Sequence, residues 1–431
     1  MKRLMEEIFL DTSILDNFEV AELYTCINKQ YIYEFLGDRY EAYNSCRLGT
    51  TLRSFDTKNK TGKVYIINGK AKTDDELLTR AKVNEIPYLK IPKKKIQNNE
   101  EIFPICETIT RDTYLFLHKK IVNLCKEHNL LVNKMVLTQC LDAYKLINSY
   151  GVKGYGYRTI FCMEIQLQNL NGKRKTYYKI MNQLLLENIL QNMSEIHMGI
   201  TMNRSMQLRH VVNKIYLSEH AVSEIVYLLL FFLTDTAMKQ GESFISRNIN
   251  ELDDVLTISS LISIEENSRL NLTVGGNIDG EGTERVSRYI FENGKYVQPI
   301  SSYGNGMGIK TTASSYRFDY RILPYTKATK IMVKNGDLLQ KELLDMCNDV
   351  VIVENLQGMY ESFDKMTFDF NAVVEADILH EGIYLGRKSV RLSSNILEIL
   401  SCVSAISRET KYECDGCLKV PAFICDMEWI I

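Results

Sequence analysis

Apolar and polar residues alternate along much of the chain, and a period of two predicts β-strands with one buried face. The alternation is regular in YRTIFCMEIQLQ, residues 157–168. The Asn171-Gly172 dipeptide that follows predicts a tight turn into a second strand, KRKTYYKI. Short strands after an initial helix are predicted over residues 16–55. KVYIINGKA predicts a hairpin that turns at Asn68-Gly69.

Other segments have the apolar spacing of helices. DDELLTRAKVNEI predicts a short helix opened by the two acidic residues at 74 and 75. Longer helices are predicted over residues 112–128 and from Tyr178 to about Ile196. The longest apolar run, Ile225–Leu233, lies in a helix that Ser218 is suited to cap, and it predicts a helix buried on nearly all sides.

Turn signals such as NG and GNG separate short strands throughout the second half of the chain. This pattern predicts a β-rich domain with a barrel- or sandwich-like arrangement. We therefore expect an α+β protein with two domains. Residues 1–215 form an N-terminal domain of helices and an antiparallel sheet, and residues 216–431 form a β-rich domain that begins with the apolar helix.

Composition narrows the functional classes. The formal net charge of −2 over 431 residues provides no basic field for nucleic acid. Tyrosines and lysines do interleave in KRKTYYKI as in an RNA-binding sheet, but a half-buried strand explains them equally well. Acidic residues interrupt the N-terminal segment and the longest apolar run is too short to cross a bilayer, so we expect neither a signal peptide nor a membrane span. The 11 cysteines then indicate reduced thiols in a cytoplasmic protein.

Two groups of residues are candidate metal ligands. His220 and Glu224 are four residues apart, which places them on one face of the apolar helix. Cys414 and Cys417 form a CxxC motif with Cys425 nearby. A structural zinc site uses four ligands, and a second CxxC pair is absent. The two thiols are therefore open to three interpretations: unligated side chains, metal ligands or a redox pair.

Several segments, taken in order along the chain, resemble the TldD/PmbA family. These peptide-processing metallopeptidases were first named as modulators of DNA gyrase. The resemblance rests on RLGTTLRSF with Gly49 and Arg53, INSYG at 147–151, DGEGTERVSRYIFENGKYV at 279–297, the late strand series at 354–385, and SSNILEIL at 393–400. Phe368 stands where the family usually has glycine, Asn371 where it has serine, and Glu375 near another expected glycine.

The resemblance also indicates whether the apolar helix is expected to hold a metal. In the TldD branch this helix carries HExxxH, which supplies two zinc ligands and a glutamate for general base chemistry, and a cysteine near the C-terminus is a further ligand. Aligned on KQGESF, the motif should fall at Val226–Phe231, where this chain has VYLLLF. None of these residues binds metal, and His220 and Glu224 lie upstream of the window. The PmbA branch, also called TldE, likewise lacks the motif.

The resemblance to the PmbA/TldE branch therefore implies a non-catalytic subunit that carries no cofactor of its own. Its expected partner is a TldD-like chain that holds the zinc, and the heterodimer trims unfolded or leader peptides, including those of peptide natural products. The peptide is bound in an extended form through its backbone. Arg285 and Gly358, on strands that match the family, are candidates for the residues that line this groove.

Two other functions remain open at this stage. The chain is a stand-alone peptide-binding scaffold without protease activity if it kept the fold but lost the partner. It is an active hydrolase if the catalytic site moved to His220 and Glu224, or to Cys414 and Cys417. Zinc content and activity of the isolated chain distinguish these alternatives from the pseudoenzyme subunit.

Overall fold

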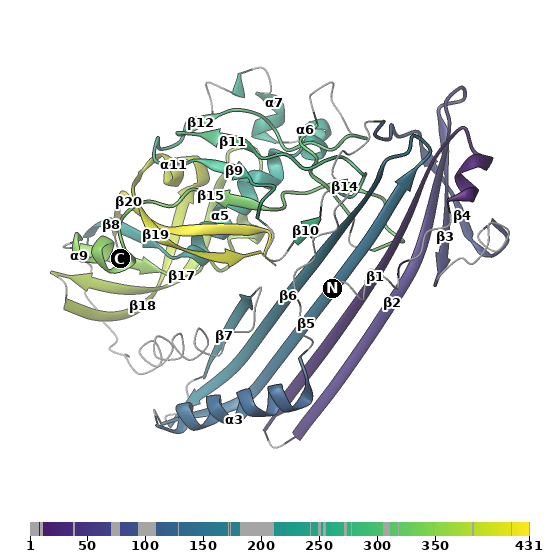
Figure 1. The fold of residues 1–431 in the computed structure, drawn as a ribbon. Coiled ribbons are helices and arrows are strands. Elements are labelled where there is room, and N and C mark those ends of the chain that lie inside the picture. Colours follow the sequence, from purple (N-terminus) through teal and green to yellow (C-terminus); the bar gives the residue numbers. More distant parts are fainter. Residues whose placement is uncertain are drawn as a thin grey trace. The chain divides into compact units, whose positions relative to one another are not determined.

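The structure of the protein is a computed structural model. The structure describes residues 8, 12–37, 39–69, 78–93, 109–127, 129–170, 172, 174–181, 211–241, 243–248, 251–252, 256–270, 274–276, 278–304, 311–317, 319–347, 349–381, 383–414 and 416–430. Antiparallel strands and helices make up the first part of the chain and a mixed sheet the second, which confirms the expected α+β class (Figure 1).

The chain divides into two compact units. The first is Met1–Ile200 with Leu270–Arg285 and Ser301–Thr326, and the second is Thr201–Arg269 with Val286–Ile300 and Lys327–Ile431. The expected boundary at residue 215 lies near the first change of unit. Two later segments return to the first unit, and one reason is that β10 (Val274–Gly276) pairs with β6 (Lys153–Asn169).

An antiparallel sheet forms the framework of the first unit, in the order β10-β6-β5-β1-β2-β3-β4, with β7 also paired to β6. Its remaining strands are β1 (Val20–Leu36), β2 (Arg39–Asp56), β3 (Thr61–Asn68), β4 (Lys82–Pro87), β5 (Leu130–Asn148) and β7 (Arg174–Met181). The short strands β13 (Ser315–Tyr316) and β14 (Tyr325–Thr326) pair separately. Buried and less buried positions alternate along β5, because successive side chains of a strand point to opposite faces.

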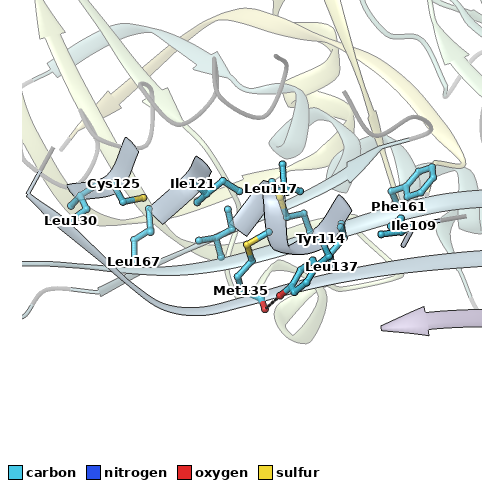
Figure 2. Packing of buried hydrophobic residues seen from close by; sticks show 12 residues of the cluster. Ile109, Tyr114, Leu117, Ile121, Cys125, Leu130, Met135, Leu137, Phe161 and Leu167 are labelled. Atoms are coloured by element: carbon cyan, nitrogen blue, oxygen red, sulfur yellow. Dashed lines mark hydrogen bonds between the residues drawn. The ribbon is translucent and has the colours of Figure 1, made fainter. Parts of the chain in front are cut away.

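The helix α3 (Arg111–Glu127) covers one face of this sheet, and it confirms the helix predicted over 112–128 (Figure 2). Tyr114, Leu117, Ile121 and Cys125 follow helical spacing and form a buried stripe against apolar residues of β5 and β6. The Tyr114 hydroxyl donates a hydrogen bond to the carbonyl oxygen of Met135 over 2.8 Å, so the one polar atom of this buried ring has a partner.

Three local predictions in this unit are wrong. The initial helix is only a 3-10 turn, η1 (Ser13–Asn17), and the expected short strands are the long β1 and β2. KVYIINGKA contributes to β3, which ends at Asn68 and pairs with β2 and β4; residues 70 and 71 lie outside the described residues, so the tight hairpin stays a prediction. Tyr178 lies in β7 rather than at a helix start, since pairing with β6 overrides local propensity. The rest of that helix lies outside the described residues. The short helix predicted over DDELLTRAKVNEI is also wrong in its last part, since residues 82–86 belong to β4 and pair with β3; residues 74–77 lie outside the described residues.

A mixed sheet forms the framework of the second unit, in the order β12-β11-β9-β15-β20-β8-β16-β17-β18, with β19 paired to β20. Its strands are β8 (Val211–Leu217), β9 (Ile264–Glu266), β11 (Arg288–Glu292), β12 (Lys295–Tyr296), β15 (Ile331–Val333), β16 (Asp349–Val353), β17 (Asp369–His380), β18 (Ile383–Asn395), β19 (Val403–Glu413) and β20 (Leu418–Ile430). Two pairs are parallel, β15 with β20 and β8 with β16. One of the NG turn signals of the second half, Asn293-Gly294, joins β11 and β12, and both residues have positive φ, 48° and 78°.

The apolar helix is α5 (Glu219–Phe232), which packs on β20, β19 and β8. Ser218 caps it as predicted, because its Oγ accepts a hydrogen bond from the backbone N–H of Ala221 over 3.2 Å. Nine of its residues are buried, which confirms a helix enclosed on nearly all sides. The shorter helices of this unit are α6 (Asp235–Gln240), α7 (Phe244–Arg247), α9 (Gln340–Asp345), α10 (Met359–Ser362) and α11 (Ile396–Ser401).

Phe368 has a left-handed backbone, the conformation that favours glycine. Its φ of 67° is left-handed, which costs a side chain about 1–2 kcal/mol. The ring is fully buried and lies 5.4–5.7 Å, centroid to centroid, from the rings of Phe232, Phe244 and Phe363. Aromatic packing therefore offsets the strain that a glycine would have avoided. Among the described residues, no helix combines the length and apolar character needed to cross a membrane.

Candidate functional site

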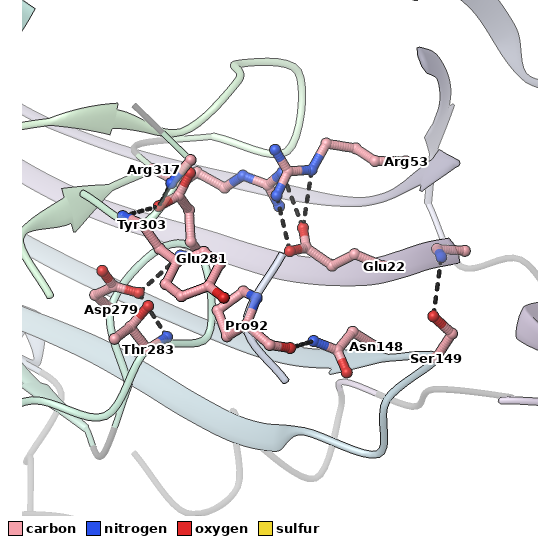
Figure 3. A network of polar contacts seen from close by, with 12 residues as sticks. Glu22, Arg53, Pro92, Asn148, Ser149, Asp279, Glu281, Thr283, Tyr303 and Arg317 are labelled. Carbon is pink, nitrogen blue, oxygen red and sulfur yellow. Dashed lines mark hydrogen bonds and ion pairs between the residues drawn. The ribbon is translucent and has the colours of Figure 1, made fainter. Parts of the chain in front are cut away.

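Several sequence segments that carry the family resemblance meet in the first unit. Arg53 of β2, the turn after β5 at Asn148 and the loop that begins at Asp279 take part in one network of polar contacts (Figure 3). The first two are about one hundred residues apart in sequence, and the third comes another 130 residues later. Tertiary pairing of β1 with β2 and β5, and of β10 with β6, brings them together.

Asn148 holds the turn between β5 and β6. Its side-chain oxygen accepts hydrogen bonds from the backbone N–H groups of Tyr150 and Val152 over 3.0 and 3.1 Å. Its amide donates to the carbonyl of Pro92 over 2.7 Å. All of these partners belong to the backbone, so the Asn-Ser-x-Gly segment has a structural role here.

Asp279 organises the loop from 279 to 283 in a similar way. One carboxylate oxygen accepts from the backbone N–H groups of Glu281 and Thr283, each over 2.9 Å, and the other accepts from that of Ser315 over 3.0 Å. Gly282 is left-handed, with a φ of 88°, which favours glycine at this position. The Glu-Gly-Thr segment of the resemblance therefore forms a tight anionic turn below the surface.

A buried ion pair lies beside this turn. Arg53 Nε and Nη2 donate to the two carboxylate oxygens of Glu22 over 3.0 and 2.8 Å, and their side chains are 1% and 0% exposed. This two-pronged geometry is the strongest form of a carboxylate–guanidinium contact. Removing either partner would leave a buried charge without its counter-ion.

Glu22 also serves a second arginine. Arg317 Nη2 lies 3.1 Å from the carboxylate in an ionic contact, and its guanidinium stacks 4.3 Å from the ring centroid of Tyr24. Burial, with the charge of Arg53 beside it, lowers the pKa of Arg317. A guanidinium still remains protonated at neutral pH, so one carboxylate is shared by two cations.

Glu281 is a further buried carboxylate near these arginines, and its negative charge is reduced by partial protonation. Burial, followed by the negative charge of Asp279, raises the pKa of Glu281 to about 7. Its Oε2 accepts hydrogen bonds from the backbone N–H groups of Tyr303 and Gly304 over 2.9 and 3.1 Å. Near neutral pH this group is partly protonated, so it compensates the arginines only in part.

A small cavity opens next to Arg317. Its volume is about 30 Å³. Its lining residues all belong to the first unit: Tyr24, Cys26, Asn28, Asp142, Ala143, Tyr144, Tyr157, Arg158, Arg285, Ser315, Tyr316 and Arg317. Arg285, expected on a strand that lines a peptide groove, instead lies in the loop before β11 and donates from Nε to the carbonyl of Ile278 over 3.0 Å.

The other predicted residues lie in the second unit. His220 is exposed on α5, and its Nδ1 lies 3.0 Å from a carboxylate oxygen of Glu413, which raises the pKa of the histidine. Glu224 is partly exposed, and its Oε2 accepts from the backbone N–H of Leu356 over 2.9 Å. The two side chains share a helix face but have separate partners.

Gly358 and the CxxC motif occupy turns. Gly358 precedes α10 with a φ of 81°, so it lies at a helix start rather than on the expected strand. Cys414 and Cys417 belong to the turn from β19 to β20, where the N–H of Cys417 donates to the carbonyl of Cys414 over 3.0 Å. Cys417 is buried and Cys414 is partly exposed. Whether Arg285 or Gly358 contacts a peptide stays a prediction.

Comparison with known proteins shows the family. The family model described as the PmbA/TldA metallopeptidase C-terminal domain matches residues 212–428, half of the chain. The chain belongs to the PmbA/TldD metallopeptidase family. No curated protein matches the sequence.

Solved structures share the fold of this PmbA/TldD chain at low sequence identity. TldE from Thermococcus kodakarensis has a TM-score of 0.81 at 14% identity, covering 96% of this chain and 97% of its own. Proposed modulators of DNA gyrase from Bacteroides thetaiotaomicron and Thermotoga maritima have TM-scores of 0.76 and 0.74 at 15% and 12% identity, and 96% of each chain is covered. At such identities the likeness shows the fold alone.

The family name implies a zinc ion, and the residues on α5 do not fit one. Val226, Leu228, Leu229 and Leu230 are buried and apolar, and no residue of the 226–231 window has a side chain that binds zinc. In the part of the chain that the structure describes, no three histidine, cysteine, aspartate or glutamate side chains are grouped to hold a metal.

Sequence patterns alone did not predict Glu22, Arg317 and Ser315 as site residues. Glu22 carried a signal, since it is a charged residue within the apolar strand segment VAELYTCI. Arg317 and Ser315 had none, because their burial depends on the return of residues 301–326 to the first unit. These residues of the PmbA/TldD chain come together only through tertiary structure.

Proposed function

We propose that this chain is the PmbA/TldE-like, non-catalytic subunit of a heterodimeric zinc metallopeptidase that processes unfolded or leader peptides. A TldD-like subunit would hold the zinc and carry out the hydrolysis. The observation that supports this role is α5, whose 226–231 window contains only aliphatic and aromatic side chains, with Val226, Leu228, Leu229 and Leu230 buried. A helix with this content contributes to the core of its unit.

The packing and contacts of α5 argue against a metal site on this helix. Placing zinc there would require polar ligands at the positions of Val226, Leu229 and Leu230, which are fully buried. Burying even one unpaired polar group costs about 1–3 kcal/mol. His220 and Glu224 are already engaged by Glu413 and a backbone N–H, so using them as ligands would break those contacts.

The fold supports a partnership rather than a loss of role. The likeness to TldE extends over 96% of the chain, with both units included. The long strands of the first unit and the mixed sheet of the second are thus preserved together. A subunit that binds a peptide through backbone hydrogen bonds needs the sheet geometry but few particular side chains.

The test combines zinc analysis with reconstitution. The purified chain is dialysed against a weak chelator, its zinc content is measured, and cleavage of an unfolded peptide is followed with and without a TldD-like chain that carries HExxxH. We expect substoichiometric zinc and no cleavage for this chain alone, and cleavage once the two chains form a complex.

Two variants serve as controls for a relocated site. His220→Ala and Cys417→Ser should leave both the zinc content of the chain and the activity of the pair unchanged. About one equivalent of zinc in the isolated chain, or turnover that Cys417→Ser abolishes, would overturn the proposal. Peptide binding without cleavage in every pairing would instead identify a stand-alone scaffold.

A further inference from the structure

Two residues that line the cavity in the first unit carry buried hydrogen-bond donors without partners. Arg317 Nε and Nη1 and Ser315 Oγ are buried and have no hydrogen-bond acceptor among the described residues. The Arg317 side chain is 1% exposed and Ser315 is 0% exposed. Buried donors of this kind normally have a partner, because leaving one unmade costs about 1–3 kcal/mol.

The charges around the cavity favour an anion. Arg158, Arg285 and Arg317 line it, whereas Asp142 is its single acidic lining residue and is paired with Arg158 over 2.7 Å. Glu22 already accepts two hydrogen bonds from Arg53. The guanidinium of Arg317 therefore has an incomplete counter-charge on the side where its N–H groups are unpaired.

The volume of the cavity and the burial of its lining residues limit the size of the anionic group that it can hold. About 30 Å³ exceeds the roughly 10–15 Å³ that one water needs, so two or three oxygen-sized atoms fit. Arg317, Ser315, Tyr24 and Cys26 are buried, while Asn28 and other lining residues are partly exposed. A small anionic group can therefore occupy the buried end while the rest of its molecule remains outside.

We propose that this cavity binds a carboxylate group, which accepts hydrogen bonds from the Arg317 guanidinium and the Ser315 hydroxyl. One carboxylate oxygen can accept from Nε or Nη1 of Arg317, since Nη2 already faces Glu22, and the Ser315 hydroxyl can donate to a remaining lone pair. The ligand is either a free small carboxylate or the C-terminal carboxylate of a peptide. The site does not depend on the proposed subunit role.

The experiment uses the purified full-length chain and simple probes. Thermal unfolding is followed in sodium acetate and in sodium chloride at equal ionic strength. Binding of trialanine with a free C-terminal carboxylate is measured by calorimetry, next to trialanine with a C-terminal amide. We expect acetate to raise the unfolding temperature more than chloride, or the acid peptide to bind where the amide does not.

Ser315→Ala is the decisive variant, and Ser314→Ala is its matched control. Removing an unpaired buried hydroxyl should not lower the stability of the unliganded chain, but it should weaken carboxylate binding about ten-fold. The Ser314 hydroxyl lies 2.6 Å from that of Thr312, and Ser314 does not line the cavity. Ser314→Ala should therefore reduce stability and leave carboxylate affinity unchanged.

Arg317→Lys keeps the positive charge beside Glu22 but loses the Nε and Nη1 donors, so it should weaken binding by at least about ten-fold. Acetate binding without peptide binding would identify a free small carboxylate as the ligand. Binding of the acid peptide at much lower concentration than acetate would identify a peptide C-terminus. The proposal would be overturned if acetate acted no differently from chloride and the acid peptide also bound no better than the amide, or if affinity were undiminished in Ser315→Ala.

Discussion

Phe368 provides a sharp test of the backbone geometry in the second unit. Its ring is fully buried among three other phenylalanines, and truncating a buried phenylalanine to alanine typically costs about 3–5 kcal/mol. Both Phe368→Ala and Phe368→Gly lose this packing. They differ in the backbone, because the φ of residue 368 is 67°.

The expected difference follows from two opposing terms. Glycine relieves the left-handed strain, worth about 1–2 kcal/mol, whereas its freedom in the unfolded chain costs about 0.5–1 kcal/mol relative to alanine. Phe368→Gly should therefore be about 1 kcal/mol more stable than Phe368→Ala. At Val374, a fully buried strand residue without positive φ, the order should reverse, with glycine less stable by about 0.5–1 kcal/mol.

Urea unfolding measures these differences. Far-UV circular dichroism follows the unfolding transition, and the fluorescence of the sole tryptophan, Trp429, is recorded beside it. The free energies of unfolding of the two variants are compared with those of the Val374 pair. If Phe368→Ala proves as stable as Phe368→Gly while the Val374 pair behaves normally, residue 368 is not held in a left-handed conformation.

Three further predictions concern the network and the helix cap. Glu22→Gln leaves Arg53 and Arg317 side by side without their shared counter-charge, and it should lower the free energy of unfolding by about 3–5 kcal/mol in chemical denaturation. The pKa of Glu281 is raised to about 7, so the folded state binds more protons than the unfolded one between about pH 4.3 and that value. The stability that protonated Glu281 contributes is therefore present at acidic pH and is lost as pH rises through its folded pKa. Glu281→Gln should flatten this decline in the free energy of unfolding. An unchanged pH profile would contradict the raised pKa of Glu281. Ser218→Ala removes the cap of α5 and should lower the unfolding free energy by about 1 kcal/mol, whereas Ser218→Asn should retain most of it.

Local sequence signals were sufficient wherever one residue or one period decides the structure. Residue 293 with its glycine predicted the turn between β11 and β12, because few residue pairs adopt two positive φ values. Ser218 and the apolar run predicted α5, its cap and its burial. The strand Val20–Leu36 was predicted incompletely, since its first part is apolar without a clear period and its length depends on pairing with β2 and β5.

The candidate site divides in the same way. The sequence alone determined the α+β class, the family resemblance and the loss of metal-binding side chains on α5, because each depends on residue type at a known position. Only the tertiary structure decided that Glu22, Arg53, Ser315 and Arg317 lie around one network and cavity. Charged residues hundreds of positions apart carry no mutual signal, and their energies become large only when folding removes water from between them.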